Sequence, residues 1–471
     1  GLPSFAIVGL PDTAVRESRE RVRAALINSG FEFPLQRIIT NLAPADVPKV
    51  GPGFDLAIAA AVLAASNQVP KAFLDQYAFA GELALDGSIR PVPGALAMAE
   101  AARGQGLRGV AVAPADGALA ALVEGIEVVG LEHVARLPVL SEGEIEPLAP
   151  RVPEAVGGVS RPDLRDLKGQ PAVRNALEIV AAGGHSLLLV GPPGAGKTLA
   201  AQRLPSLLPP LAPAEALDVI RIAGACGNGI ATAVPERPFR SPHHTVSARA
   251  LIGGGSPPRP GEVTRAHRGV LFLDELGEFR RDALEALRQP LEEGTVTLAR
   301  ARRTISLPCR FSLVAASNPC PCGQGGDSGA CECHPSALAR YEAKLSGALA
   351  DRIDVFVGVG RPGADELAGA AGEPSSEVRA RVSAARQRQR ERLGDGRCNA
   401  EMTPEETRRH CALDAGAERT LRDGHDRFGL SGRGWDRVLR VARTIADLES
   451  EDSIRDADVI RALGMRRRKA A

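Results

Sequence analysis

HSLLLVGPPGAGKT, residues 185–198, is the most informative segment of the sequence. Four apolar residues, Leu187 to Val190, predict a buried strand of a parallel sheet. A glycine-rich loop and a helical run follow, an arrangement in which backbone N–H groups face one anion at the positive end of the helix. Lys197 can then reach the β- and γ-phosphates of a nucleotide, and the Thr198 hydroxyl can bind Mg²⁺. The residues expected to hold ATP are Gly191, Pro192, Pro193, Gly194, Ala195, Gly196, Lys197 and Thr198.

Carboxylates follow a second apolar run, GVLFL at residues 269–273. At the edge of the sheet that faces the phosphates, Asp274 would assist Mg²⁺ and Glu275 would polarise the attacking water. A third strand is expected over residues 310–316, RFSLVAA, and Asn318 follows it. A polar side chain at that point would lie near the γ-phosphate. The three runs together predict a nucleoside triphosphatase.

These motifs, in this order, resemble those of AAA+ ATPases. The resemblance implies that Asn318 is the sensor-1 residue and that Arg352 reaches a neighbour's γ-phosphate as an arginine finger. It also implies that Arg433 is the sensor-2 residue, with Arg437 as the competing choice. Residues 167–170 are candidates for contact with the adenine base. The alternative for Arg352 is a surface salt bridge.

The insertion between the phosphate loop and Asp274 contains adjacent histidines, His243 and His244. Neighbours in an extended chain point apart and rarely share one metal ion. We therefore expect these histidines to order a loop.

The first 140 residues alternate short apolar runs with helical patterns and predict an α/β domain. The segment KVGPG, residues 49–53, and the later glycines resemble the proteolytic fold of Lon-type proteases. The family's serine position holds Gly53 and its lysine position holds Leu96, so Ser–Lys hydrolysis is excluded. Since the sequence begins at Gly1 without Met, this domain is expected to be incomplete at its N-terminus. A role in assembly or binding is expected for it.

The predicted fold class is α/β throughout the first two domains, followed by an all-helical lid. Residues 141–163 are rich in Pro, Gly and Glu and predict a linker. The full prediction is a non-catalytic Lon-protease-like domain over 1–140, the linker, a parallel-sheet AAA+ core over 164–360 and a helical magnesium-chelatase-type lid over 375–471.

The composition of the chain limits the partners and the compartment that we expect for it. The chain has 471 residues and a formal net charge of +1, so any basic surface must be local. The longest unbroken apolar run, residues 56–65, is too short to span a bilayer, and no membrane partner is expected. Eight cysteines, four of them crowded between residues 320 and 333, suggest a reducing compartment such as the cytoplasm.

Two further segments carry candidate binding residues. Residues 295–308, TVTLARARRTISLP, predict a β-hairpin whose basic tip suits DNA phosphates, with a solvated turn as the alternative. The candidate DNA-binding residues are Arg300, Arg302 and Arg303. Two C-x-C pairs can form a tetrahedral Zn²⁺ site, with free cysteines as the alternative. The candidate zinc ligands are Cys320, Cys322, Cys331 and Cys333.

Taken together, the chain resembles the YifB/ComM family of magnesium-chelatase-like proteins. The segments that carry the resemblance include GPPGAGKT, RPFRSPHHT, GEVTRAHRGVLFLDELGEF, LRQPLEEG, SNPCPCG, LSGALADRID and SGRGWDRVLRVARTIADL. The resemblance implies a hexameric ATPase that binds single-stranded or branched DNA and drives branch migration as a helicase. The alternative is a magnesium-chelatase-type ATPase subunit that remodels a protein partner. A scaffold that uses ATP only as a switch is disfavoured, because the residues expected for hydrolysis are present.

Overall fold

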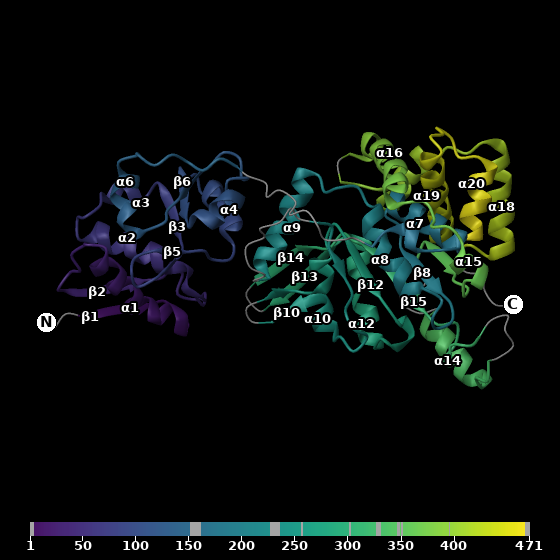
Figure 1. Cartoon of the computed structure of the whole chain (residues 1–471), viewed down its shortest axis with the longest axis horizontal. Helices are drawn as coiled ribbons and strands as arrows, with labels where there is room; N and C mark the ends of the chain where they lie inside the picture. Colours follow the sequence, from purple (N-terminus) through teal and green to yellow (C-terminus); the bar gives the residue numbers. More distant parts are fainter. Residues whose placement is uncertain are drawn as a thin grey trace. The chain divides into compact units, whose positions relative to one another are not determined.

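The computed structural model describes residues 4–150, 162–226, 236–255, 258–300, 303–325, 331–345, 349, 352–394 and 396–466. The chain divides into two compact units. Gly1–Gly157 and Ile220–Val234 form the first unit, and Gly158–Val219 and Pro235–Ala471 form the second. The first unit contains the purple and blue segments of Figure 1.

The first unit is an α/β fold with small sheets. Its parallel sheets have the strand orders β1-β2 and β3-β6-β7. The strands are β1 (Ser4–Val8), β2 (Arg37–Asn41), β3 (Tyr77–Ala80), β4 (Glu82–Leu83), β5 (Ile89–Arg90), β6 (Gly109–Val112) and β7 (Glu127–Gly130). The helices are α1 (Thr13–Asn28), α2 (Asp55–Ala65), α3 (Lys71–Leu74), α4 (Ala95–Gly104), α5 (Pro114–Ala120) and α6 (Leu137–Ser141). Helix α2 is apolar around most of its circumference and is correspondingly buried.

The second unit is built on a five-stranded sheet of order β16-β8-β15-β12-β9, in which every pair is parallel. The strands are β8 (Leu187–Val190), β9 (Phe239–Arg240), β12 (Val270–Leu273), β15 (Ser312–Ser317) and β16 (Val355–Gly358). The apolar runs predicted as strands thus form β8, β12 and β15, which lie side by side in Figure 1. Strands β12 and β15 are buried along their whole length, as expected where both faces of a parallel sheet are covered.

Short elements surround this sheet. The helices are α7 (Pro171–Gly183), α8 (Lys197–Leu207), α10 (Ala248–Ile252), α11 (Glu262–Arg265), α12 (Arg281–Ala286), α13 (Arg288–Glu293), α14 (Pro335–Leu345) and α15 (Ala364–Ala368). Helix α9 (Pro213–Ala225) crosses the boundary between the units at Ile220. The remaining strands form two antiparallel pairs, β10 (Gly253–Gly254) with β11 (Arg259–Pro260) and β13 (Thr295–Arg300) with β14 (Arg303–Pro308).

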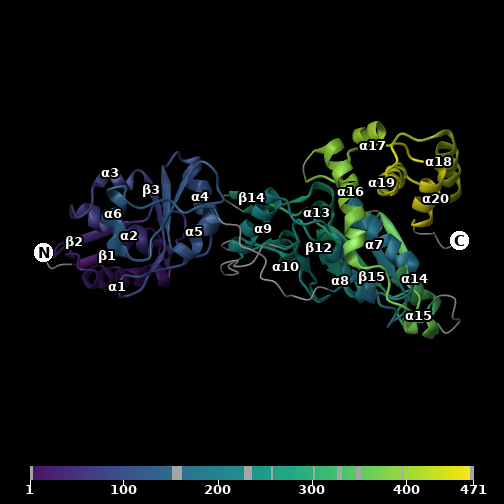
Figure 2. The same ribbon diagram turned by 45° about the horizontal axis from the view of Figure 1, so that its top comes forward.

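The C-terminal region is helical and packs on the sheet region of the same unit. Its helices are α16 (Ser375–Leu393), α17 (Pro404–His410), α18 (Ala415–Phe428), α19 (Gly432–Leu448) and α20 (Asp456–Gly464). Figure 2 shows α16 beside α7. Helices α18 and α19 begin at side-chain caps, because Asp414 accepts the N–H of Ala417 and Ser431 accepts that of Gly434. Apolar residues of α7, α16, α19 and the strands share one core. Among the described residues, none of the helices is both long and apolar enough to cross a membrane.

A buried polar network joins α19 to the sheet. His185 Nε2 lies 2.8 Å from Thr444 Oγ1, and His185 Nδ1 lies 3.5 Å from Asp354 Oδ2. Arg437 Nε lies 3.4 Å from the other oxygen of Asp354. Burial alone would raise the pKa of Asp354, but the neighbouring His185 and Arg437 side chains lower it to about 2. The helical lid is therefore tied to the start of β16 by charge as well as by packing.

Acid is expected to destabilise the second unit through His267. This side chain is buried, and its Nδ1 accepts the N–H of Arg310 at 3.0 Å. Burial, helped by the charge of Arg268, lowers the pKa of His267 from 6.5 to about 4. His267 is therefore protonated below about pH 6.5 in the unfolded chain but only below about pH 4 in the folded chain. Between these pH values the free energy of unfolding falls by about 3 kcal/mol as the pH is lowered. Urea unfolding of the full chain between pH 7 and pH 4 measures the loss.

The variant His267→Asn should flatten this part of the pH dependence, whereas His243→Asn, at an exposed position, should leave it unchanged. An equally steep pH dependence in His267→Asn would contradict the assignment.

Candidate active site

The predicted phosphate loop connects β8 to α8. Gly194 and Gly196 have φ angles of +79° and +89°, which glycine adopts without steric cost. At Gly191 a Cβ atom would lie 2.1 Å from the carbonyl oxygen of Val359, so only glycine fits there. Helix α8 begins directly at Lys197, and its free N–H groups face the loop. The loop therefore has the backbone that anion binding requires.

Lys197 lies at the centre of the predicted site. Its Nζ donates to the carbonyl oxygens of Gly191 and Pro192 at 2.6 and 3.0 Å, and to Asn318 Oδ1 at 3.0 Å. Burial lowers the pKa of Lys197, while the charges of Asp274 and Glu275 oppose that shift. Strand β15 lies between β8 and β12, and this order brings Asn318 next to the loop.

Two oxygen-bearing side chains meet where Mg²⁺ was predicted. Thr198 Oγ1 donates to Asp274 Oδ2 at 2.6 Å, and Asp274 Oδ1 accepts the N–H of Glu275 at 2.9 Å. A hydroxyl and a carboxylate beside a phosphate loop are oxygen ligands that suit Mg²⁺, which takes its remaining ligands from phosphate and water. The donor set therefore fits the ion.

Glu275 has an unusual backbone and an unexpected partner. Its φ is +53°, a left-handed conformation that costs a non-glycine residue about 1–3 kcal/mol and is enriched at active sites. Its half-exposed carboxylate Oε2 lies 3.3 Å from Nδ1 of His244, which follows β9. We expected His244 only to order a loop, and this contact with Glu275 was missed. The adjacent histidines give no signal of it, because it depends on β9 pairing with β12.

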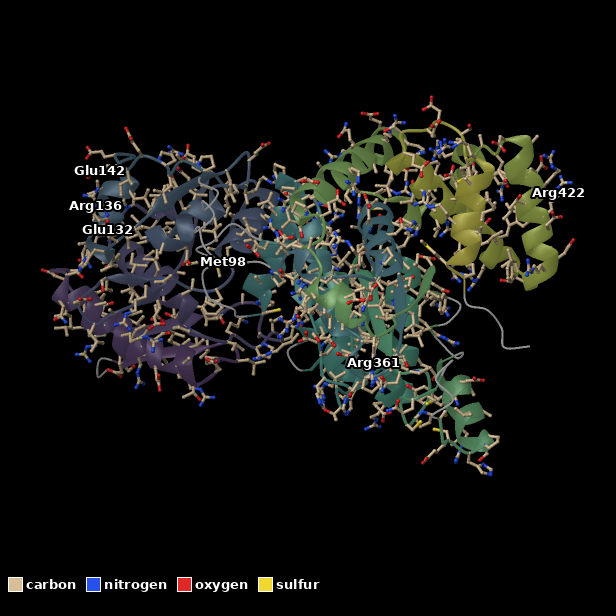
Figure 3. The ribbon with its side chains drawn as sticks, turned by 45° about the vertical axis from the view of Figure 1, so that its right-hand side comes forward. Met98, Glu132, Arg136, Glu142, Arg361 and Arg422 are labelled. Atoms are coloured by element: carbon tan, nitrogen blue, oxygen red, sulfur yellow. The ribbon has the colours of Figure 1, made fainter. Side chains whose placement is uncertain are left out.

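Two further residues contact the phosphate loop. The Nε2 of Gln170 donates to the carbonyl oxygens of Ala195 and Gly360 at 2.8 and 3.1 Å. Its buried Oε1 has no hydrogen-bond partner among the described residues. Gln170 is the last of the residues 167–170 proposed for adenine, and Leu167 is part of the apolar core. Arg361, labelled in Figure 3, donates from Nε to the carbonyl oxygen of Pro193 at 3.3 Å and was not predicted.

Arg352 and Arg433 lie together at the other edge of the sheet. Arg352 precedes β16, and its backbone carbonyl accepts the hydroxyl of Ser186, which precedes β8, at 2.6 Å. The side chains of Arg352 and Arg433 both contact Glu292 Oε1, the latter at 3.2 Å. Both line a cavity of about 680 Å³. Four residues of β8 separate this edge from the phosphate loop, a length of about 13 Å. The structure therefore brings these arginines to each other and not to Lys197 of the same chain.

The predicted hairpin is present as β13–β14, with Arg300 paired to Arg303 at its tip. Arg302 lies outside the described residues, as do the side chains of Arg300 and Arg303.

The four cysteines between residues 320 and 333 come together in the loop after β15. Their sulfur atoms all lie within 4.8 Å of one another, and each thiol is free of a disulfide. We call Cys320, Cys322, Cys331 and Cys333 the cysteine knuckle. The residues present can ligate a thiophilic metal ion.

Comparisons with known proteins identify the family of the chain. Family models match residues 163–367 ("Magnesium chelatase, subunit ChlI"), 1–116 ("Subunit ChlI of Mg-chelatase") and 372–466 ("Magnesium chelatase, subunit ChlI C-terminal"). The chain is 44% identical to "Uncharacterized protein YifB" of Salmonella typhimurium, over 96% of this chain and 90% of that protein. It is 40% identical to "Competence protein ComM" of Haemophilus influenzae, over 99% and 92%. A "Magnesium-chelatase 38 kDa subunit" of Rhodobacter capsulatus is 28% identical over 36% of this chain and 53% of that protein.

Fold, site and family models define a magnesium-chelatase-like AAA+ ATPase, a class that implies ATP and Mg²⁺. Within that class, the near full-length relatives show that the chain belongs to the YifB/ComM family.

Proposed function

We propose that this chain is an ATP-driven DNA motor of the cytoplasm, which assembles as a hexameric ring and moves along single-stranded or branched DNA as a branch-migration helicase. The observation that carries the ATPase part is the meeting of Lys197, Asp274 and Asn318 at one sheet edge. The basic hairpin supports the DNA part, as does the printed name of a relative, a competence protein.

In this proposal, each side chain around the phosphate loop has a role in ATP hydrolysis. Glu275 orients a water molecule for in-line attack on the γ-phosphate, and His244 holds the carboxylate of Glu275. Lys197 stabilises the charge that develops on the phosphate oxygens. Thr198 and Asp274 would hold Mg²⁺, which when bound neutralises charge on the phosphates.

The arginines at the other edge serve a neighbouring subunit in this proposal. Arg352 and Arg433 lie too far from their own loop, and the ring would bring them to the next subunit's γ-phosphate. Glu292, which contacts both, would hold them in place until the phosphate replaces its carboxylate. The proposal also includes a Zn²⁺ ion on the cysteine knuckle, which would contact neither the nucleotide nor the attacking water.

The second candidate is a magnesium-chelatase-type subunit that remodels a protein partner. The matches to chelatase subunit models favour it. The two candidates share their ATPase chemistry and differ in what stimulates it.

The steady-state ATPase rate with and without DNA separates them. The DNA motor requires a rate that rises with single-stranded or forked DNA, and this stimulation should fall steeply as salt is raised. A rate that no DNA changes would contradict the DNA motor and favour a protein partner.

Replacing His244 by Ala is expected to lower kcat for ATP about tenfold while the Kd for ATP stays within about twofold, because a misplaced Glu275 no longer aligns the water. ATPase rates and the binding of a fluorescent ATP analogue measure the two effects. His243→Ala is the control, since it removes the neighbouring ring, whose centre lies 4.1 Å from that of His244, and leaves the imidazole that contacts Glu275. Equal losses in both variants would contradict a positioning role for His244.

A further inference from the structure

The sulfur atoms of the cysteine knuckle are spaced as a tetrahedral metal site requires. Cys320 Sγ lies 3.2 Å from Cys322 Sγ and 3.6 Å from Cys331 Sγ, and Cys322 Sγ lies 3.8 Å from Cys331 Sγ. Zn–S bonds of about 2.3 Å place the ligands of a tetrahedral ion about 3.8 Å apart. A disulfide would hold two sulfurs at about 2.05 Å, far closer than any of these pairs.

Backbone donors already point at the knuckle. The N–H of Gly325 donates to Cys320 Sγ at 3.0 Å, and the N–H of Cys322 donates to Cys333 Sγ at 3.4 Å. Such bonds stabilise negative charge on thiolate ligands and orient them around an ion. Cys320 is buried whereas Cys322 is exposed, so the site is closed on its protein side and accessible from solvent.

The knuckle contacts the elements that hydrolyse ATP. Only Pro319 separates Cys320 from Asn318, whose amide bonds to Lys197. The backbone at Gly323 packs on the phosphate loop so closely that a Cβ atom there would lie 2.8 Å from Pro193 Cδ.

Helix α14, which follows the knuckle in the sequence, also holds Asn318 in place. Tyr341 of α14 forms hydrogen bonds through its hydroxyl with Ser317 Oγ at 3.0 Å and with the carbonyl oxygen of Asn318 at 3.2 Å. Asn318 is thus held between the knuckle and α14, and both of these elements lie outside the sheet.

We propose that the cysteine knuckle is a tetrathiolate zinc site that fixes Asn318 and Pro193, so that the bound ion sets the rate of ATP hydrolysis. The coupling rests on the proposed ATPase activity, whereas the metal site does not. Loss of the ion frees the loop after β15, and Asn318 no longer meets Lys197 at the γ-phosphate. Because the ion lies beside the sensor and not on the loop's N–H groups, ATP binding persists while turnover falls.

The test measures zinc by elemental analysis and basal ATPase kinetics on the full chain. The wild type should carry about one zinc per chain, and Cys331→Ser should lose it. In Cys331→Ser, kcat should fall about tenfold while the Kd for a fluorescent ATP analogue stays within about twofold. Cys333→His should keep both zinc and turnover, because histidine is an accepted zinc ligand.

A control variant separates the knuckle from the other thiols of the chain. Cys226→Ser, outside the knuckle, should keep zinc and kcat. A wild type without zinc would overturn the site, and full turnover in zinc-free Cys331→Ser would overturn the coupling. A wild type that binds zinc but hydrolyses no ATP would instead overturn the proposed function and the coupling that rests on it. The zinc site itself would stand.

Discussion

Glu275→Gln is expected to lower ATP turnover by about 10²–10⁴-fold while ATP binding is retained. The amide keeps the size of the side chain and its contact with His244, but it cannot accept a proton from the attacking water. Lys197, Thr198 and the loop N–H groups are unchanged, so the Kd for ATP should stay within about twofold. Phosphate release and equilibrium binding of a fluorescent ATP analogue measure the two quantities.

Glu278→Gln is the matched control. Glu278 lies three residues further on, is exposed, and contacts Glu275 through a backbone hydrogen bond of 2.7 Å. Its substitution should leave turnover within about twofold of the wild type. Substantial turnover by Glu275→Gln would mean that another group orients the water.

Arg352→Ala is expected to lower turnover about 10³-fold or more, the range measured for arginine fingers. The side chain lies at the amino edge of the sheet and cannot reach the phosphates of its own chain. ATP binding should therefore be unaffected. The control is Arg422→Ala, because Arg422, which is labelled in Figure 3, lies on α18 and pairs there with Glu418.

Mixing the two inactive variants tests whether Arg352 acts on a neighbour. A site has both wild-type residues when an Arg352→Ala chain supplies its phosphate loop and Glu275, and an adjacent Glu275→Gln chain supplies its arginine. In rings assembled from equal amounts, about a quarter of the sites are of this kind and should recover activity. If the mixture stays inactive although the chains assemble together, the arginine does not act between subunits.

The sequence predicted those parts of the fold and site that local pattern determines. The phosphate loop, the carboxylates after β12 and Asn318 after β15 follow from apolar runs that end in polar residues. Parallel strands place such residues at one edge, and the hydrogen bond between Lys197 and Asn318 agrees with that expectation.

Contacts that depend on tertiary packing could not be predicted in this way. His244 meets Glu275 because β9 pairs with β12, and Arg433 meets Arg352 because α19 packs near the start of β16. Arg361 meets the phosphate loop because β16 pairs with β8. None of these pairs has a sequence signature, since the residues belong to elements whose order in the sheet is not visible in the chain.

Strand β8 begins beside Arg352 and ends at the phosphate loop, so in the proposed ring each chain would contribute to two reaction centres, one at each end of the strand. If the subunits of that ring are arranged head to tail, an isolated chain would complete neither centre. Specific activity should then climb with protein concentration until rings predominate and be nearly zero in dilute solution. Under the proposed function, assembly would therefore control ATP consumption, because dispersed chains would hydrolyse little ATP and formation of the ring would activate all of its centres together.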